Sequence, residues 1–303
     1  MTTTETCYRH PGVITGVHCT RCGRPICTDC MIPAAVGYQC PTCVEDARRE
    51  FRRGPGRPLR RGNLSATRVL LVLILIGFAI ELAVGGPQAL MTGPSECKLI
   101  QLGAMQPILI AHGQLWRLFA AMFLHAGLLH IAFNAYALYL FGTIVERDFG
   151  TARFLAIFFV TGLLAGVASY AFGSVGEVGV GASGAIFGIF GAFIAYNFRR
   201  RHLAMAAANL RWAMTLIVLN AVLAFGFSEI DWRAHVGGLV AGVIAGAAAE
   251  GVGTPSQRRM IALAGFLGLI ALGVALLAWR TADIQGLPGF EQAARQILLQ
   301  CSR

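Results

Sequence analysis

From about Ala66 onward the chain alternates between long apolar stretches and short polar connections. A helix needs about 20 residues to cross about 30 Å of hydrocarbon. Backbone polar groups find no water partner in lipid, so stretches that cross a membrane must be helical. The pattern predicts seven membrane-spanning helices, over about residues 66–84, 126–145, 154–173, 182–198, 212–228, 234–249 and 260–279.

Composition agrees with this pattern. Of the 303 residues, 56% are hydrophobic and 13% are charged, whereas soluble proteins carry about 25% charged residues. Lys98 is the only lysine among 25 basic residues, and this arginine bias indicates a GC-rich bacterial genome. No cleavable signal peptide is visible, so we expect the first apolar stretch to act as an uncleaved insertion signal.

Arginines crowd just ahead of the first apolar stretch and recur in alternate connections. The positive-inside rule then predicts a cell-membrane protein with a cytoplasmic N-terminus and, after seven helices, an extracytoplasmic tail over 281–303. A nucleic-acid patch is the alternative. We favour a juxtamembrane cluster that contacts anionic lipid of the bilayer, and expect no nucleic-acid partner. The cluster comprises Arg48, Arg49, Arg52, Arg53, Arg57, Arg60 and Arg61.

The connection over about residues 85–125 is unusually long and semi-apolar, with Trp116 and Arg117 near its end. Loops of this length usually have a function. Aromatic residues beside an arginine are typical of helices that lie in the membrane interface. We therefore expect short interfacial helices here, in preference to a disordered loop.

Four polar residues lie near the predicted outer ends of three helices. Ser183 begins the fourth helix, His235 begins the sixth, and His130 and Asn134 share one face of the second. Polar groups at membrane depth are costly and therefore suggest function. A lone membrane serine usually bonds its own helix, but this set combines a nucleophile, a base and two hydrogen-bond donors.

The helices that carry Ser183 and His235 also carry small residues at close spacing. Such stripes let helix backbones approach closely. Close approach is what a Ser–His hydrogen bond of about 3 Å requires. The stripes are Gly184, Gly188 and Gly191 in one helix and Gly238, Gly242 and Gly246 in the other.

With these motifs in this order, residues 66–250 resemble the rhomboid family of intramembrane serine proteases. Phe187 stands where many relatives have tyrosine, and its ring can keep the stack beneath the histidine. The matching motifs are Trp116-Arg117, then His125 with His130 and Asn134, then Glu146-Arg147 with Gly150, then residues 181–184, then residues 234–238 with Gly242.

The resemblance implies a role for each polar residue. Ser183 is the nucleophile, and His235 is the general base that later returns the proton to the leaving amine. His130, Asn134 and the Ser183 backbone N–H form the oxyanion hole. We find no third acidic residue that orients the base, and Asp231 is left unassigned. Catalysis needs no cofactor. Substrates are transmembrane segments of other membrane proteins, cleaved near the outer face after a small residue.

Residues 1–46 hold four pairs of cysteine or histidine with the spacing typical of zinc knuckles. Eight ligands suit two structural zinc ions. Interleaved pairing resembles B-box-type fingers and is preferred over sequential pairing, with His18 as a spare ligand. Disulfides are disfavoured because the module is expected in the cytoplasm, where it would bind a protein partner or regulate access. The ligands are Cys7, His10, Cys19, Cys22, Cys27, Cys30, Cys40 and Cys43.

The sequence thus predicts an all-α polytopic membrane protein: a zinc-binding module over 1–46, a basic linker over 47–64, a rhomboid-like six-helix core over 65–250, and a seventh helix with a tail over 251–303. The expected function is a serine endopeptidase that acts through an acyl-enzyme. The alternative is a non-catalytic rhomboid-like protein that binds transmembrane helices. A transporter would need inverted repeats, which we do not find. Cys97 and Cys301 are expected outside, either as a disulfide or as two free thiols.

Overall fold

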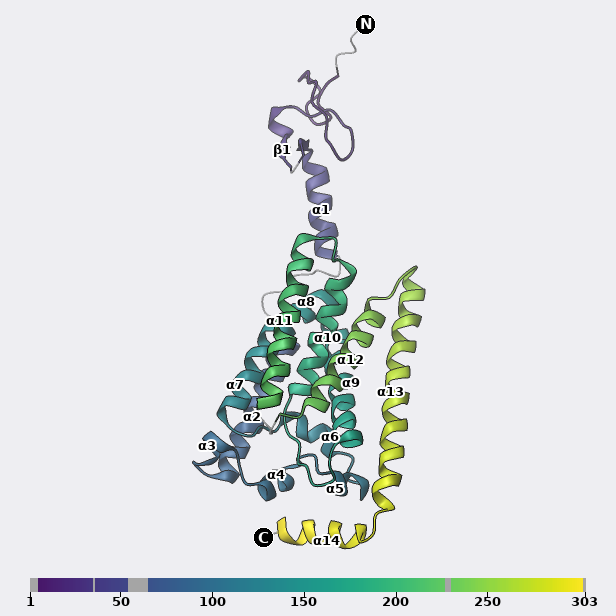
Figure 1. Cartoon of the computed structure of the whole chain (residues 1–303). Helices are drawn as coiled ribbons and strands as arrows, with labels where there is room; N and C mark the ends of the chain where they lie inside the picture. Colours follow the sequence, from purple (N-terminus) through teal and green to yellow (C-terminus); the bar gives the residue numbers. More distant parts are fainter. Residues whose placement is uncertain (1–4, 35, 54–64, 227–229, 302–303) are drawn as a thin grey trace. The chain divides into compact units, whose positions relative to one another are not determined.

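The computed structural model describes residues 5–34, 36–53, 65–226 and 230–301, with side chains at all of these except 50–53 and 223–226. The chain divides into two units, Met1–Arg61 and Gly62–Arg303. The first is built from short elements, and the second is almost entirely helical (Figure 1).

The N-terminal unit is small and its interior consists largely of cysteine side chains around Ile26. A 3-10 turn, η1 (Thr28–Cys30), precedes strands β1 (Ile32–Pro33) and β2 (Tyr38–Gln39). The strands pair antiparallel, with Ile32 opposite Gln39. Helix α1 (Pro41–Arg53) is the last described element of the unit.

Helix α1 extends into the predicted linker over 47–64, since residues 47–53 are helical. The segment is rich in good helix formers, and Arg49 Nη2 donates to Glu45 Oε1 at 2.8 Å, an i,i+4 pair of the kind that supports helices. The glycine- and proline-rich stretch begins only at Gly54. Residues 54–64 lie outside the described residues.

The second unit has a helix at each of the seven predicted places. The second predicted helix is interrupted by a π-helical turn, η3. The fifth begins earlier than predicted, and the seventh extends further at both ends. Residues 227–228 of the predicted fifth helix lie outside the described residues. The helices are α2 (Ala66–Gly85), α7–η3–α8 (Leu128–Ala137, Leu138–Gly142 and Thr143–Phe149), α9 (Thr151–Phe172), α10 (Ser183–Arg199), α11 (Ala204–Gly226), α12 (Trp232–Glu250) and α13 (Pro255–Gln285).

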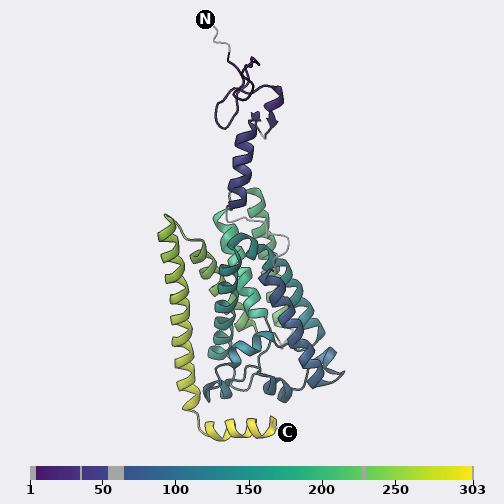
Figure 2. The ribbon, with the colours of Figure 1, turned by 180° about the vertical axis from the view of Figure 1, so that it is seen from behind.

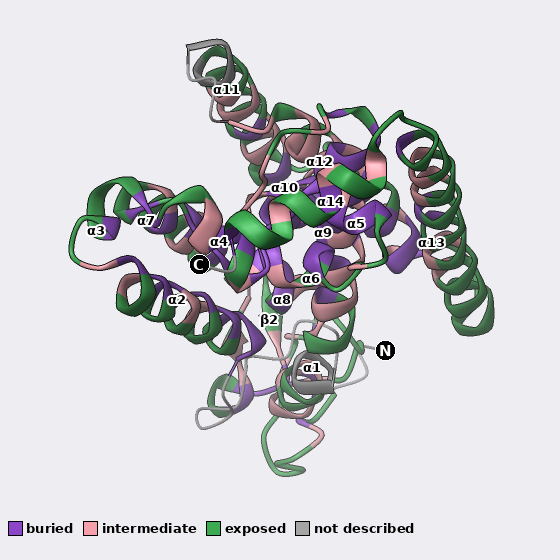
Figure 3. Ribbon diagram, turned by 90° about the horizontal axis from the view of Figure 1, so that it is seen from below, coloured by how far each residue is buried: buried purple, intermediate pink, exposed green. Residues whose placement is uncertain are grey.

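Five of these segments are long and apolar enough to cross a membrane: α2, residues 128–149, α9, residues 204–222 of α11, and α13. The other two are α10, which has 17 residues, and α12, which is rich in glycine and alanine. Figure 3 shows buried positions gathered on α9, α10 and α12, while α2, α11 and α13 expose outer faces. The lower hydropathy of α12 thus follows from small residues that serve packing inside the bundle.

The 85–125 connection folds into short helices, as predicted, and the disordered-loop alternative is wrong. The elements are α3 (Ala89–Thr92), α4 (Glu96–Leu102), α5 (Pro107–Ala111), α6 (Arg117–Ala120) and η2 (Ala121–Phe123). Arg117 organises this region from within: its Nη1 donates to the carbonyls of Ile100 at 2.7 Å and Ala104 at 3.0 Å.

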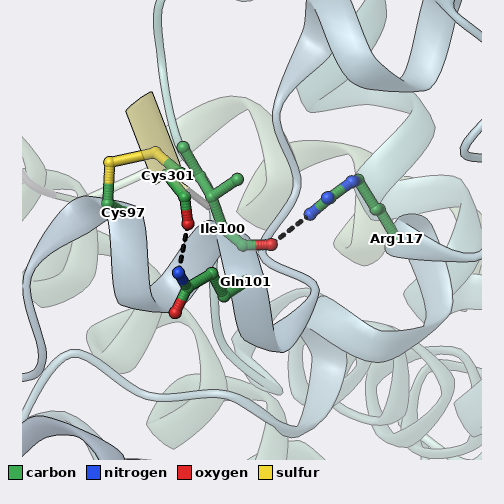
Figure 4. Close-up of a disulfide and its surroundings, with 5 residues drawn as sticks. All are labelled: Cys97, Ile100, Gln101, Arg117 and Cys301. Carbon is green, nitrogen blue, oxygen red and sulfur yellow. Dashed lines mark hydrogen bonds between the residues drawn. A yellow bond between two sulfur atoms is a disulfide. The ribbon is translucent and has the colours of Figure 1, made fainter. Parts of the chain in front are cut away.

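The C-terminal tail forms helix α14 (Phe290–Cys301), which packs against α4 and α5 beyond the end of α13 (Figures 1 and 2). A disulfide joins Cys301 to Cys97 of α4, so of the two alternatives the bridge is the one observed (Figure 4). Gln101 Nε2 donates to the Cys301 carbonyl beside it. The seventh helix is therefore tied covalently to the first long connection.

Candidate active site and metal-binding clusters

Ser183 and His235 lie 52 positions apart in sequence and meet in the structure. Ser183 is the first residue of α10, and His235 lies in the first turn of α12. Ser183 Oγ and His235 Nε2 are 2.9 Å apart, which is hydrogen-bond distance. The predicted nucleophile and base are therefore in direct contact.

Glycine makes this contact possible. A Cβ atom at Gly238 would lie 2.1 Å from the Gly184 carbonyl oxygen, and one at Gly242 would lie 2.0 Å from that of Gly188. Real side chains cannot approach backbone this closely, so α10 and α12 pack backbone to backbone along these positions. The predicted close approach is confirmed.

Phe187 fixes the plane of the His235 ring. It lies one turn after Ser183, and its ring stacks on the imidazole with centroids 4.3 Å apart and planes at 15°. The predicted stack is present with phenylalanine in place of tyrosine.

His130 and Asn134 converge on the loop that precedes Ser183. A Cβ atom at Gly181 would lie 2.7 Å from His130 Nε2 and 3.6 Å from Asn134 Nδ2. Gly181 has φ +126°, a conformation that favours glycine. Both nitrogens therefore face the backbone two residues before the nucleophile.

The hydrogen bonds of these two residues leave their donors available. The Ala126 N–H donates to His130 Nδ1 at 3.2 Å, so a neutral ring carries its proton on Nε2, the atom that faces Gly181. Asn134 Nδ2 is buried and has no hydrogen-bond partner among the described residues. At the start of α10 the Ser183 N–H belongs to the helix's unpaired amide groups. Two side-chain donors thus face the loop that ends at the Ser183 N–H.

The loop between α9 and α10 (residues 173–182), called the serine loop, is hydrogen-bonded to the 85–125 connection. Gly179 and Met105 exchange backbone hydrogen bonds of 2.9 Å, and the Gly181 N–H donates to the Ala121 carbonyl at 2.9 Å. The 85–125 connection therefore holds the backbone just before the nucleophile in place.

In the N-terminal unit the eight predicted ligands form two groups, in the interleaved order. Within each group the ligand atoms lie within 4.8 Å of one another. His18 belongs to neither and bonds the Glu5 carboxylate instead. Each group offers four sulfur or imidazole nitrogen donors from three buried residues and one exposed residue, a set that fits a tetrahedral zinc ion. The groups are Cys7, His10, Cys27 and Cys30, and Cys19, Cys22, Cys40 and Cys43.

Comparison with known proteins matches residues 112–250 to the Rhomboid domain. The rhomboid protease GluP of Bacillus subtilis (strain 168) is 35% identical over 233 residues, covering 75% of this chain and 43% of the relative. YdcA from the same strain is 35% identical over 135 residues, covering 45% of this chain and 67% of the relative. The chain belongs to the rhomboid family. Rhomboid-like protease 1 of Toxoplasma gondii is 33% identical over 155 residues, covering 49% of the chain and 52% of the relative.

This rhomboid chain spans less than half the length of GluP. The match to GluP covers more of the chain than the Rhomboid domain alone.

Glu146, one of the motif residues of this rhomboid, supports the fold at a distance from Ser183. It is buried and accepts hydrogen bonds from the N–H groups of Ala66 at 2.8 Å and Thr67 at 3.0 Å, and from the hydroxyls of Thr67 at 2.7 Å and Thr151 at 3.0 Å. A carboxylate at the start of α2 satisfies amides that the helix leaves unpaired. The Glu146 carboxylate therefore joins α8 to α2, the first of the predicted membrane helices.

Two polar contacts of the rhomboid bundle were not predicted from the sequence. Asn220 Oδ1 lies 3.3 Å from His235 Nδ1, and buried Glu81 accepts a hydrogen bond from the His125 N–H at 2.5 Å. Each is a polar residue within an apolar helix, which was the available signal. Asp231, left unassigned, caps α12 by accepting from the Ala234 N–H at 3.1 Å.

Proposed function

We propose that this rhomboid protein is an intramembrane serine endopeptidase that uses Ser183 and His235. The observation that carries the proposal is the 2.9 Å contact between Ser183 Oγ and His235 Nε2, with His130 and Asn134 turned toward the same loop. Relatives named rhomboid proteases support the same activity class.

Proton transfer and bond formation follow from this arrangement. Ser183 Oγ attacks the scissile carbonyl carbon while His235 Nε2 takes the hydroxyl proton. The carbonyl oxygen becomes an oxyanion, and His130 Nε2–H, Asn134 Nδ2–H and the Ser183 N–H stabilise it. When the C–N bond breaks, His235 returns the proton to the leaving amine. An ester on Ser183 remains, and water hydrolyses it with His235 again as base.

The substrates that fit are single transmembrane segments of other proteins, approached from within the bilayer. The site lies near the ends of α10 and α12, inside a bundle with five helices apolar enough to span a membrane. A stable helix hides its carbonyls in intrahelical hydrogen bonds, so the substrate must unwind locally before Ser183 can attack. By resemblance to the family, cleavage would fall near the outer membrane face and after a small residue.

The pairing of the cysteines supports the predicted orientation. Cys97 and Cys301 are joined as a disulfide, whereas the seven cysteines of the N-terminal unit belong to the two metal-binding groups. Disulfides persist in oxidising compartments and thiols in the cytosol. We therefore place α4 and α14 outside the cell and the N-terminal unit in the cytoplasm, with all seven helices crossing.

Each cysteine-rich group would hold one structural zinc ion. One group offers a histidine and three thiolates, and the other offers four thiolates. Four protein ligands would leave a tetrahedral zinc ion no free coordination position for a substrate. Bound zinc would stabilise a unit too small to build a large apolar core.

The rival function is a rhomboid-like protein that captures transmembrane helices without cutting them. Reaction of Ser183 with a fluorophosphonate separates the two, because only an activated serine reacts quickly. We expect wild type to be labelled and Ser183→Ala and His235→Ala to remain unlabelled. Equal labelling of wild type and Ser183→Ala would show that the probe modifies another residue, and an unreactive wild type favours the binder.

A further inference from the structure

We propose that Asn220 is a positioning residue that holds His235 in its base-competent tautomer. The inference rests on the proposed function and adds a third member to the Ser183–His235 pair. Asn220 comes from α11, so the three side chains link α11, α12 and α10 in one hydrogen-bonded chain.

The assignment follows from the two nitrogens of one imidazole. A neutral ring carries one proton and offers one acceptor. The Asn220 Oδ1 atom, 3.3 Å away, is an acceptor, and it stabilises the proton on Nδ1. That leaves the lone pair on Nε2, which faces the Ser183 hydroxyl at 2.9 Å. The opposite tautomer would present N–H to the serine and could not take its proton.

Other groups near His235 do not supply this orientation. Phe187 covers a face of the ring, and the Asp231 carboxylate bonds the Ala234 N–H at the start of α12. Asp231 and His130 are the titratable groups that act on His235 electrostatically. Among the described residues, Asn220 is the hydrogen-bond partner of Nδ1.

The surroundings of Asn220 explain why an amide is suited to the task. It is a polar residue in the apolar segment 213–222 of α11, where neighbours such as Val218 and Val222 are exposed on the outer face of the bundle. A polar group at membrane depth is costly unless it has a partner. An amide provides the acceptor without introducing a buried charge.

The same helix offers a matched control. Asn209 lies three turns earlier on α11, and its Nδ2 donates to Asn197 Oδ1 of α10 at 2.8 Å. Asn209→Ala therefore removes an interhelical hydrogen bond of α11 without touching His235. A general loss of α11 packing would affect both variants, and a loss of base orientation would affect only one.

The test compares Asn220→Ala, Asn220→Asp and Asn209→Ala in full-length protein in liposomes, by cleavage kinetics and by fluorophosphonate labelling of Ser183. We expect Asn220→Ala to lower kcat and the labelling rate about 10- to 100-fold, with KM within about twofold, because base catalysis contributes about 100-fold or more. Asn220→Asp should restore part of the rate. It should also move the acid limb of the pH–rate profile up by about one unit, because a carboxylate favours the protonated imidazole.

Two results would overturn the assignment: wild-type kcat and labelling in Asn220→Ala, or equal losses in Asn209→Ala with no shift of the pH profile in Asn220→Asp. Should Asn220→Ala fail to fold, the pH profile of Asn220→Asp decides alone. Labelling keeps the two proposals distinct. A wild type that labels at Ser183 faster than Asn220→Ala supports the role of Asn220 even where the substrate is not cleaved, whereas a wild type that neither labels nor cleaves contradicts the protease.

Discussion

Gly181 and His130 lie so close that a single methyl group at position 181 would sit 2.7 Å from His130 Nε2. The serine loop and α7 therefore share one narrow space, in which the proposed oxyanion would form. Gly181 also has φ +126°, so any side chain there is strained as well as crowded.

Gly181→Ala should reduce cleavage by about 100-fold or more, the cost of losing an oxyanion donor, because the methyl group displaces His130. Gly176 of the same loop is exposed, with no atom closer than 4.0 Å to a Cβ built there. Gly176→Ala should retain wild-type turnover. Equal activity in the two variants would contradict the placement of His130 beside the nucleophile.

His130→Ala and Asn134→Ala should each lower kcat and leave KM nearly unchanged, because their donors bind the oxyanion and not the ground-state carbonyl. About 3 kcal/mol of lost stabilisation corresponds to roughly 100-fold. Leu129, 68% exposed on the same helix, provides the control Leu129→Ala. A rise in KM at constant kcat would assign these residues to substrate binding instead.

Glu146→Gln should destabilise the membrane unit without a selective effect on kcat. The carboxylate accepts four hydrogen bonds from α2 and Thr151, and an amide can replace only one of its two oxygens. Hydrogen bonds to a charged group contribute about 1.5–3 kcal/mol each, so the midpoint of thermal unfolding should fall measurably. Arg147→Ala, at an exposed neighbour, should leave the midpoint unchanged. A folded, equally stable Glu146→Gln protein that has lost kcat would point to a catalytic role.

The metal content of a double variant tests the interleaved pairing. Cys19 and Cys40 belong to one group in the structure, so replacing both by serine should leave one zinc ion per chain, bound by the other group. Sequential pairing puts them in different sites and predicts that both ions are lost. Chelation of wild type should expose the thiols of residues 5–43 to alkylation while the membrane unit stays folded.

The orientation is tested at both ends of the chain. A reporter fused after residue 303 should be extracytoplasmic, and Cys97 and Cys301 should react with maleimide only after reduction, since they form a disulfide. A cytoplasmic reporter would show that one of the seven helices does not cross the membrane. Cys301→Ser frees α14 from α4, and its effect on cleavage measures how much the serine loop depends on the 85–125 connection.

Hydropathy could predict the helices because each has to hide its backbone from lipid wherever it lies in the bundle. Ser183, His235, His130 and Asn134 could be proposed because polar side chains at membrane depth are rare. Four pairs of ligands can be combined into two groups of four in three ways, and the structure has the interleaved arrangement that the sequence favoured.

The remaining features depend on contacts between distant segments. Asn220 meets His235 only because α11 packs beside the start of α12. Glu146 caps a helix about 80 residues earlier in the chain. The packing of α14 against α4 and α5 likewise could not be predicted from the hydrophobic pattern of the sequence. The extension of α1 to Arg53 reflects local helix propensity that the glycine- and proline-rich stretch after it obscured.

The most direct measurement is cleavage of a single-span substrate by purified wild-type protein and by Ser183→Ala in liposomes, with the fragments identified by mass spectrometry. The account predicts cleavage within or beside the transmembrane segment by wild type and none by Ser183→Ala. Equal cleavage by both proteins would contradict Ser183 as the nucleophile. Binding of the substrate without cleavage, by a wild type whose Ser183 does not react with a fluorophosphonate, would contradict the protease itself.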